Sequence, residues 1–333
     1  MPEVHFLTVG EGDCTLIRHS SGRVSMIDIC GGNRARKSQE ELRRAMLIES
    51  LQLARGNPLG NYRMCENPTH PLDYIQDRSL HPIYRFISTH PDMDHLDGFK
   101  ALLDTFAVHN FWHTGAEKQK PEFDKSPYSE ADWDAYKKVQ RGDVSGTKSL
   151  EKLDGATFEF ANKGGDGDRG DCLHIAAPSA GLVSQANNEQ EFNDSSYIIV
   201  YRMQGGKIVI CGDAEDGAFN HAIEKYPRLM EDVGILLAPH HGRDSGRDYG
   251  FLDHLNPRFT LLGCAPHEHH RTSSWTSRGL AYCKQNQCGN MIAVPSREDG
   301  RIDLYIQSKS FAENSGGDSN RTYVEGMYFF KTV

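Results

Sequence analysis

Residues 86–99, FISTHPDMDHLDGF, place two histidines and three aspartates between His90 and Gly98. The segment follows a short apolar run that predicts a buried strand and precedes a run with helical spacing. Alternate residues of a strand share one face, and imidazole together with carboxylate suits Zn²⁺, Mn²⁺ or iron. The alternative is a solvated turn in which one aspartate caps the helix, but four ligand-type residues in six positions argue against it. The candidate metal ligands of this segment are His90, Asp92, Asp94 and His95.

Three later stretches also combine acids or histidines with the end of an apolar, strand-like run. They are VICGDAED, ILLAPHHGRDSG and GCAPHEHH, at 209–216, 235–246 and 263–270. A rigid strand positions the loop that follows it, so strand ends are favoured places for functional residues. We therefore expect these loops to add ligands or proton donors to the same site. The candidates are Asp213, His240 and His241, with at least one of His267, His269 and His270.

The chain has 333 residues, enough for one large or two small domains. Short strand-like runs occur in both halves with helical runs between them, and we find no internal repeat. This pattern predicts an α/β fold with two mixed β-sheets and outer helices in a single domain over 1–333. A polar, charged stretch at about 115–150 is expected to be an insertion. Further predictions are a helix at 40–54, a hairpin at 195–211 and a strand at 323–330.

Composition limits the classes of function. The formal net charge is −9, which counts against non-specific nucleic-acid binding by this chain alone. No run of about 18 apolar residues predicts a membrane span, and the N-terminus does not have the pattern of a signal peptide. The eight cysteines are scattered without a C-x-x-C pair. We interpret them as reduced thiols of a cytoplasmic protein, with a Cys283–Cys288 disulfide or metal pair as the alternative.

Taken together, these stretches resemble the metallo-β-lactamase fold. More narrowly, they resemble the hydrolase domain of the DNA-uptake protein ComEC and its stand-alone soluble relatives. VHFLTVGEGDCTLI is similar to the opening strand–GxGD–strand of that family, and Asp28 in SMIDICGG matches its first acidic motif. STHPDMDHLDG resembles the central motif, and NDSSYIIVY, ICGDAE and APHHGRDSG resemble the later ones in the same order. The resemblance implies an αββα sandwich with metal ions at the open edge between the sheets.

The resemblance also implies a ligand set for two divalent ions, Mn²⁺ or Zn²⁺. His90 and Asp92 would bind one ion, Asp94 and His95 the other, Asp213 would bridge them, and His240 would complete the second site. Many relatives have histidine at the position of Asp92 and a further histidine midway, where this chain offers only Asn193 or Ser196. The first site is therefore poorer in nitrogen, which favours Mn²⁺ over Zn²⁺ and leaves single-metal occupancy open. His174 could fill the gap but is expected in the core.

The leading hypothesis is a metal-dependent phosphodiesterase, and most specifically a nuclease, in which a metal-bound hydroxide attacks phosphorus. Asp94 would act in catalysis, and His241 or His270 would stabilise charge or protonate the leaving oxygen. The expected partners are nucleic acid or another phosphodiester, a protein that recruits or activates the enzyme, and no membrane. Arg243, Arg247 and Arg271 could contact phosphates or simply be solvated. The alternatives are hydrolysis of a small ester, thioester or lactone, and a catalytically silent regulatory subunit.

Overall fold

The computed structural model describes residues 1–34, 62–163, 170–244, 246, 249–265 and 269–333. The helix predicted at 40–54, together with His267 and Arg247, lies outside these residues.

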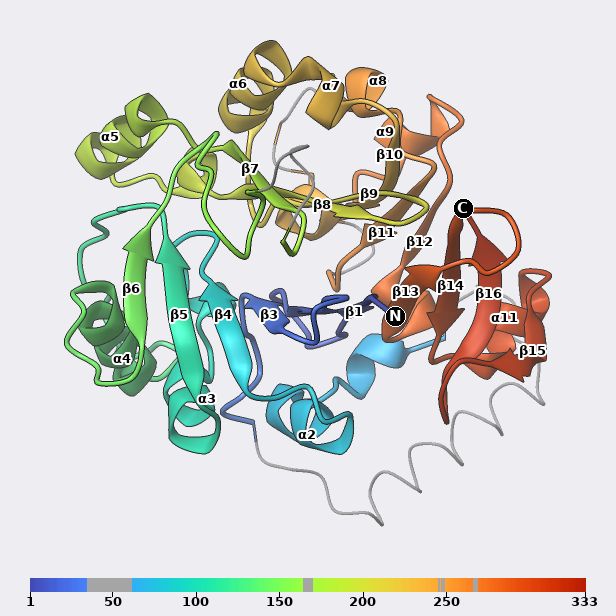
Figure 1. Ribbon diagram of the computed structural model, residues 1–333, viewed down its shortest axis with the longest axis horizontal. Coiled ribbons are helices and arrows are strands. Elements are labelled where there is room, and N and C mark those ends of the chain that lie inside the picture. The colour runs from blue at the N-terminus through green and yellow to red at the C-terminus, as the bar shows by residue number, and fades with distance from the viewer. Residues whose placement is uncertain (35–61, 164–169, 245, 247–248, 266–268) are drawn as a thin grey trace.

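Two β-sheets face each other across the centre of the molecule (Figure 1). The larger sheet contains, in spatial order, β15 (Asp318–Thr322), β16 (Tyr328–Thr332), β14 (Ile302–Ile306), β13 (Met291–Pro295), β1 (Glu3–Phe6), β2 (Thr15–Arg18), β3 (Val24–Ile27), β4 (Ile83–Ile87), β5 (Val108–His113) and β6 (Lys148–Glu151). The smaller sheet contains β12 (Tyr282–Lys284), β11 (Phe259–Leu262), β10 (Val233–Leu237), β9 (Gly206–Ile210), β8 (Ile198–Met203) and β7 (Leu173–Ala177). Both sheets contain parallel and antiparallel pairs, so both are mixed.

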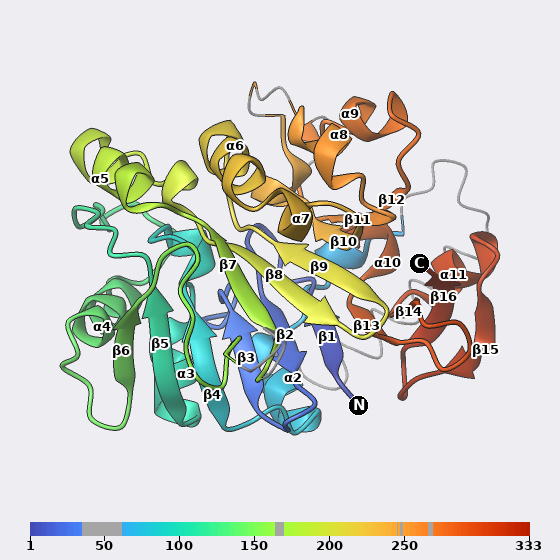
Figure 2. The same ribbon diagram turned by 45° about the horizontal axis from the view of Figure 1, so that its top comes forward.

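Helices cover the outer face of each sheet, as Figures 1 and 2 show. The larger sheet carries α2 (Pro71–Asp77), α3 (Phe99–Thr105) and α4 (Glu130–Gln140). The smaller sheet carries α5 (Ala180–Glu189), α6 (Asp216–Lys225), α7 (Pro227–Met230), α8 (Phe251–Leu255) and α9 (Ser273–Thr276). Two further helices, α10 (Gln285–Cys288) and α11 (Lys309–Asn314), belong to the C-terminal part. The layer order is helix, sheet, sheet, helix, which confirms the predicted αββα sandwich.

The strands are apolar on both faces because both faces of each sheet are covered. In β4, Phe86 packs beneath the outer helices while Ile87 packs between the two sheets. In β8, Ile199 faces the space between the sheets, whereas Ile198 and Val200 pack against the helices of the second sheet. Successive residues of a strand point to opposite faces, so each strand contributes to two hydrophobic layers. Three apolar layers therefore hold the four layers of secondary structure together.

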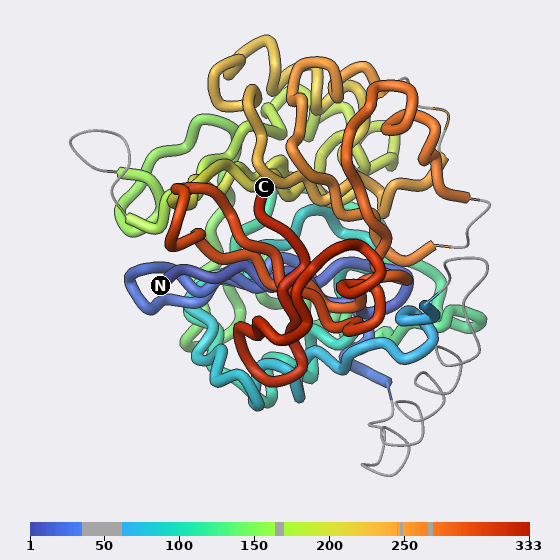
Figure 3. Tube along the Cα trace, turned by 90° about the vertical axis from the view of Figure 1, so that its right-hand side faces the viewer, coloured from blue at the N-terminus to red at the C-terminus, as the bar shows by residue number. Residues whose placement is uncertain are grey.

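The N- and C-terminal parts of the chain share one sheet. β1 pairs with β13 in an antiparallel register that sets Val4 opposite Ala293, and Figure 3 shows the C-terminal segment beside the N-terminal strands. The predicted hairpin is confirmed by the antiparallel pairing of β8 with β9. The strand predicted at 323–330 is wrong in its first half, since the chain turns at 323–327 and β16 begins only at Tyr328.

The stretch at 115–150, predicted as an insertion, contains α4 and most of the edge strand β6, which pairs with β5. On α4, Trp133, Tyr136 and Val139 are buried in the layer beneath the larger sheet. The single-domain organisation of the chain stays a prediction.

One cysteine prediction is wrong. Cys65 and Cys264 form a disulfide, although 199 positions separate them in the chain. The other six cysteines are free thiols, and Cys283 and Cys288 are buried among them without a disulfide between them. Cysteine spacing alone cannot reveal a pairing between distant segments. No helix in the described ranges is long and apolar enough to cross a membrane.

Candidate metal centre

The central motif lies in the loop that follows β4, at one edge of the space between the sheets. A short 3₁₀ turn, η2 (Met93–His95), precedes α3. Gly98 opens α3 with a φ of +99°, and a Cβ there would come within 2.3 Å of the Cα of Gly32. A larger residue would therefore be both strained and in collision with the neighbouring loop. The glycine thus allows the loop to pack tightly enough to hold its acids and histidines in place.

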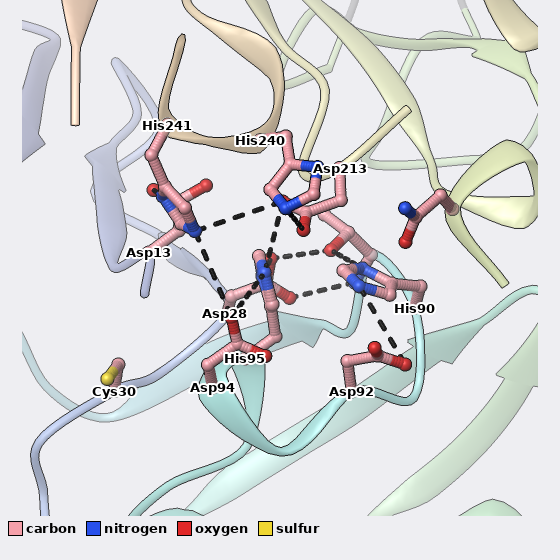
Figure 4. Close-up of polar contacts among 12 residues, drawn as sticks. Asp13, Asp28, Cys30, His90, Asp92, Asp94, His95, Asp213, His240 and His241 are labelled. Carbon is pink, nitrogen blue, oxygen red and sulfur yellow. Dashed lines mark hydrogen bonds and ion pairs between the residues drawn. The ribbon is translucent and has the colours of Figure 1, made fainter. Parts of the chain in front are cut away.

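Four side chains converge on one point, as Figure 4 shows. They are Asp94, His95, Asp213 and His241, and one ligand atom of each lies within 4.8 Å of all the others. The Nε2 of His95 is 3.3 Å from Asp213 Oδ1 and 3.8 Å from Asp94 Oδ2. The Nε2 of His241 is 3.9 Å from Asp94 Oδ2 and 4.0 Å from Asp213 Oδ1. Ligands of one tetrahedral ion lie about 3.4 Å apart when each bond is about 2.1 Å long, so the four atoms could bind one divalent ion if they move closer together.

A carboxylate behind each histidine of the cluster fixes the orientation of its ring. The Nδ1 of His95 lies 2.8 Å from Asp28 Oδ2, and the Nδ1 of His241 lies 3.2 Å from Asp13 Oδ1. When Nδ1–H donates to a carboxylate, Nε2 carries the lone pair that can bind a metal. Both Nε2 atoms are buried without a hydrogen-bond partner. Buried polar atoms are nearly always satisfied, so these two atoms point to an ion as their partner.

The electrostatics of the cluster agree with this interpretation. Burial by itself lowers the pKa of His95, but the carboxylates of Asp213 and Asp94 raise it well above its usual value. Burial also opposes protonation of His241, but Asp13 and Asp94 raise its pKa to about 10. For Asp213, burial raises the pKa and His95 lowers it, with a net shift well below the usual value. The carboxylates of Asp13, Asp94 and Asp213 stabilise positive charge on the two histidines here, and a divalent cation can take the place of those protons.

Asp28 connects the motif to the sheet. Its carboxylate accepts hydrogen bonds from the backbone N–H of Thr89 (2.8 Å) and from the Thr89 hydroxyl (2.6 Å), in addition to the contact with His95. Asp28 is 1% exposed and follows β3 directly. The strand end thus holds both the start of the loop and one ligand ring.

Asp213 arrives from the smaller sheet. It follows β9 through Gly212, which has a φ of +48° and packs against Thr89, so that a Cβ there would lie 2.5 Å from the Thr89 hydroxyl oxygen. This close approach brings the strand end of one sheet against the loop of the other. The site therefore lies between the two sheets, with ligands from both.

The two adjacent histidines take different places. Both have left-handed backbone conformations, with φ of 49° for His240 and 59° for His241, which few residues other than glycine adopt. His241 is 1% exposed and belongs to the cluster. His240 has a side chain that is 25% exposed, and its Nε2 lies 3.6 Å from Asp213 Oδ2. The structure thus brings His241, expected only as a catalytic group, into the ligand cluster and leaves His240 at its border.

The remaining predicted residues lie beside the cluster or beyond it. His90 is buried on one side of it, with its ring centre 4.3 Å from that of His95 (Figure 4). Its Nε2 has no hydrogen-bond partner and is 4.0 Å from Asp92 Oδ1. His270 pairs with Arg243 in an isolated bridge, and its Nε2 lies 3.1 Å from the carbonyl oxygen of Gly263. His269 is exposed. The catalytic role expected of His270 stays a prediction, as do the individual metal assignments.

The residues that the sequence offered as alternative ligands or phosphate contacts also have defined positions in the structure. Asn193 donates a hydrogen bond to Glu215, and Ser196 is fully buried. His174 lies on β7 opposite Val200, away from the cluster. Arg271 pairs with Asp244, and the guanidinium of Arg243 lies 3.5 Å from Glu11.

Sequence reasoning missed three residues that complete the site: Asp13, Thr89 and Lys118. Asp13 ends the GxGD stretch and Thr89 precedes His90, so both lie within recognised motifs, but the sequence assigned neither residue a role. Lys118 lies in the stretch predicted as an insertion, and nothing in its local sequence indicates its contact with Asp92.

Comparisons with known proteins give similarity to solved structures alone. No protein-family model matches the chain, and no curated protein matches it. It is similar to the crystal structure of Tm1679, a metal-dependent hydrolase of the β-lactamase superfamily, with 10% identity, a TM-score of 0.47 and coverage of 87% of this chain and 98% of that one. It is also similar to a diphosphatase from the PhnP family, with 10% identity, a TM-score of 0.42 and coverage of 85% and 95%. A third similar structure is a long-form RNase Z from yeast, with 12% identity, a TM-score of 0.37 and coverage of 87% of this chain and 41% of that one.

Proposed function

We propose that this chain is a metal-dependent hydrolase of phosphodiesters, with nucleic acid as the leading substrate class. The convergence of Asp94, His95, Asp213 and His241 on one point is the observation that carries the proposal. A divalent ion held there would supply Lewis acidity, which lowers the pKa of a water and stabilises negative charge on phosphate oxygens. The choice of nucleic acid as the substrate is supported by the narrower resemblance of the motifs to the ComEC hydrolase domain.

The protein residues around the ion have distinct tasks in this proposal. Asp28 and Asp13 hold the rings of His95 and His241 so that their Nε2 atoms face the ion. His240 is the better placed proton donor for the leaving oxygen, since its ring borders the cluster and is partly exposed. We prefer it to His270, whose Nε2 lies next to the carbonyl of Gly263.

A substrate panel tests the proposal directly. The purified protein would be incubated with Mn²⁺, Zn²⁺ or Mg²⁺ and with single- and double-stranded DNA, RNA, bis-p-nitrophenyl phosphate, p-nitrophenyl acetate and a lactone. We expect metal-dependent cleavage of the model diester and of at least one polymer. Cleavage of the carboxylic ester or lactone without any diester would overturn the substrate class.

A matched pair of variants links the activity to the cluster. Asp94→Asn removes one ligand charge with little change of shape and should abolish metal-dependent turnover. Asp104→Asn makes the same chemical change on an exposed acid paired with Lys100 and should leave turnover intact. Equal activity of the two variants would refute the assignment.

A further inference from the structure

Asp92 has a cation as its partner already. The ammonium of Lys118 lies 2.6 Å from Asp92 Oδ1, and the two side chains are 26% and 33% exposed. This pair stands beside the ligand cluster: Asp92 Oδ1 is 4.0 Å from Nε2 of His90, and the centre of the His90 ring is 4.3 Å from that of the cluster residue His95. A lysine ammonium thus occupies the side of the site where the sequence predicted the first metal ion.

The backbone around Lys118 is held on both sides by α5 and the residues after it. The N–H of Glu117 donates to Asn187 Oδ1 (2.7 Å), and the N–H of Gln119 donates to Gln190 Oε1 (3.0 Å). The side chain of Gln190 also donates to the carbonyl of Glu117. A lysine whose two neighbours are fixed in this way is directed toward the site by the fold.

The side chain of Lys118 has a built environment as well. Its ammonium lies 5.5 Å from the centre of the Phe192 ring, and this ring is 3% exposed and packs with Ala116 and Ala186. An aromatic face attracts a cation and orients it. Asp92 and Phe192 therefore position the charge from two directions.

On this side the Nε2 of His90 is also buried without a hydrogen-bond partner, but the carboxylate of Asp92 beside it is already occupied by Lys118. Within the described ranges, one group of three or more ligand residues meets the geometry of a metal site, and it contains neither His90 nor Asp92. An ion bound to Asp92 Oδ1 at about 2.1 Å would lie within about 5 Å of the ammonium on the same oxygen. Two positive charges would then compete for one carboxylate.

We propose that Lys118 takes the place of a second metal ion. Its ammonium neutralises Asp92, so the chain binds one divalent ion at Asp94, His95, Asp213 and His241. The substrate part rests on the proposed function: the ammonium hydrogen-bonds to a non-bridging oxygen of the phosphodiester, which a fixed cation beside the reacting centre stabilises. The metal count differs from the two ions that the sequence favoured.

Metal counting tests the first part without any substrate. Apoprotein would be titrated with Mn²⁺ or Zn²⁺ by calorimetry, and metal retained after dialysis would be measured by mass spectrometry. We expect one ion per chain for the wild type and for Lys118→Arg, which keeps the charge. Lys118→Met keeps the aliphatic stem but removes the charge, and it should bind a second ion, with Asp92 as its new ligand.

Controls separate this effect from loss of folding. Lys120→Met removes a neighbouring charge that pairs with Glu130 and Asp134, and it should bind one ion. Adding Asp92→Asn to Lys118→Met should return the count to one. Two ions of similar affinity in the wild type, or an unchanged count in Lys118→Met with an intact melting curve, would overturn the proposal.

The substrate part has a separate measurement. Lys118→Met should lower kcat/KM for bis-p-nitrophenyl phosphate by about tenfold or more, with partial recovery in Lys118→Arg. A neutral phosphotriester, which has no anionic oxygen, should lose less than the diester. Equal losses on the two substrates would remove the ammonium from substrate binding. If no variant cleaves any diester while the metal counts differ as expected, the proposed function fails and the replacement of the ion by Lys118 stands.

Discussion

The hydrogen bond between Asp28 and His95 gives the sharpest test of the candidate metal centre. Asp28 accepts from three donors: the Nδ1 of His95 at 2.8 Å, the N–H of Thr89 at 2.8 Å and the Thr89 hydroxyl at 2.6 Å. In Asp28→Asn, the amide oxygen can still accept from the Thr89 N–H. The amide NH₂ then faces the Thr89 hydroxyl and the Nδ1 of His95. An amide donor opposite Nδ1 favours the tautomer that carries its proton on Nε2, and that proton points into the ligand cluster.

The magnitude follows from the loss of one correctly oriented ligand. Substitutions of such carboxylate partners cost about 10- to 100-fold in metal affinity, equivalent to about 1.4–2.8 kcal/mol. The apoprotein should also lose about 2–3 kcal/mol of stability, because a charged acceptor in a buried network is replaced by a neutral one. The ligand residues themselves are unchanged in this variant, so any loss of affinity is an effect of orientation.

The assay is a competitive titration of Zn²⁺ or Mn²⁺ against a chromophoric chelator, run beside urea unfolding of the apoprotein. Asp303→Asn is the matched control: Asp303 is 2% exposed, accepts a hydrogen bond from the Thr332 hydroxyl at 2.6 Å and pairs with Arg321, away from the ligand cluster. It should lower stability and leave metal affinity unchanged. The reasoning is refuted if Asp28→Asn binds metal as the wild type does while losing as much stability as the control.

Three further predictions concern the stability of the fold. Gly98→Ala should cost about 2 kcal/mol or more in urea unfolding, because a Cβ there meets Gly32; Gly142→Ala, at a φ of +80° with no atom within 4 Å, should cost about 1 kcal/mol, and equal losses would contradict the clash. Replacing Cys65 and Cys264 by serine should remove about 2–4 kcal/mol, read as a lower melting temperature that no longer responds to reductant; an unchanged melting temperature would argue against the disulfide. Burial and then Lys137 lower the pKa of His113 to about 4, so the unfolded chain binds the extra proton between about pH 6.5 and 4 and the folded chain does not. The free energy of unfolding should therefore fall as the pH drops through this window, and His113→Gln should reduce that fall by up to about 3 kcal/mol; the same pH profile in both proteins would contradict the assignment.

The sequence predicted the layers well because their cause is local. Short apolar runs bounded by Gly, Asp and Ser correspond to strands such as β4 and β10, whose side chains are buried on both faces. The central motif could likewise be predicted, since four ligand-type residues within six positions are close together in any compact loop. The strand prediction at 323–330 failed because its apolar residues continue through a turn at Gly326, whose φ of +76° reverses the chain.

Contacts between residues that are far apart in the chain could not be predicted from the sequence. His240 and His241 are equivalent in a motif and share a left-handed backbone conformation, yet it is the ring of His241 that belongs to the cluster. The carboxylate behind His241 comes from Asp13, 228 positions away. Spacing along the chain contains no information about either contact.

The stretch at 115–150, predicted as an insertion from its polar composition, contains a contact that composition does not reveal. Glu117 and Gln119 are held by the side chains of Asn187 and Gln190, so their backbone groups are satisfied by a helix that comes some 70 positions later. This arrangement places the charge of Lys118 against Asp92. The other two acids of the central motif have other partners: Asp94 belongs to the ligand cluster, and Asp97 accepts hydrogen bonds from Gly31 and Asn33. A two-metal site would require the carboxylate of Asp92 to be free for an ion. Instead, four hydrogen bonds hold the backbone around Lys118, two from the N–H groups of Glu117 and Gln119 and two to the carbonyls of Gly115 and Glu117. This arrangement is better suited to one ion and one ammonium.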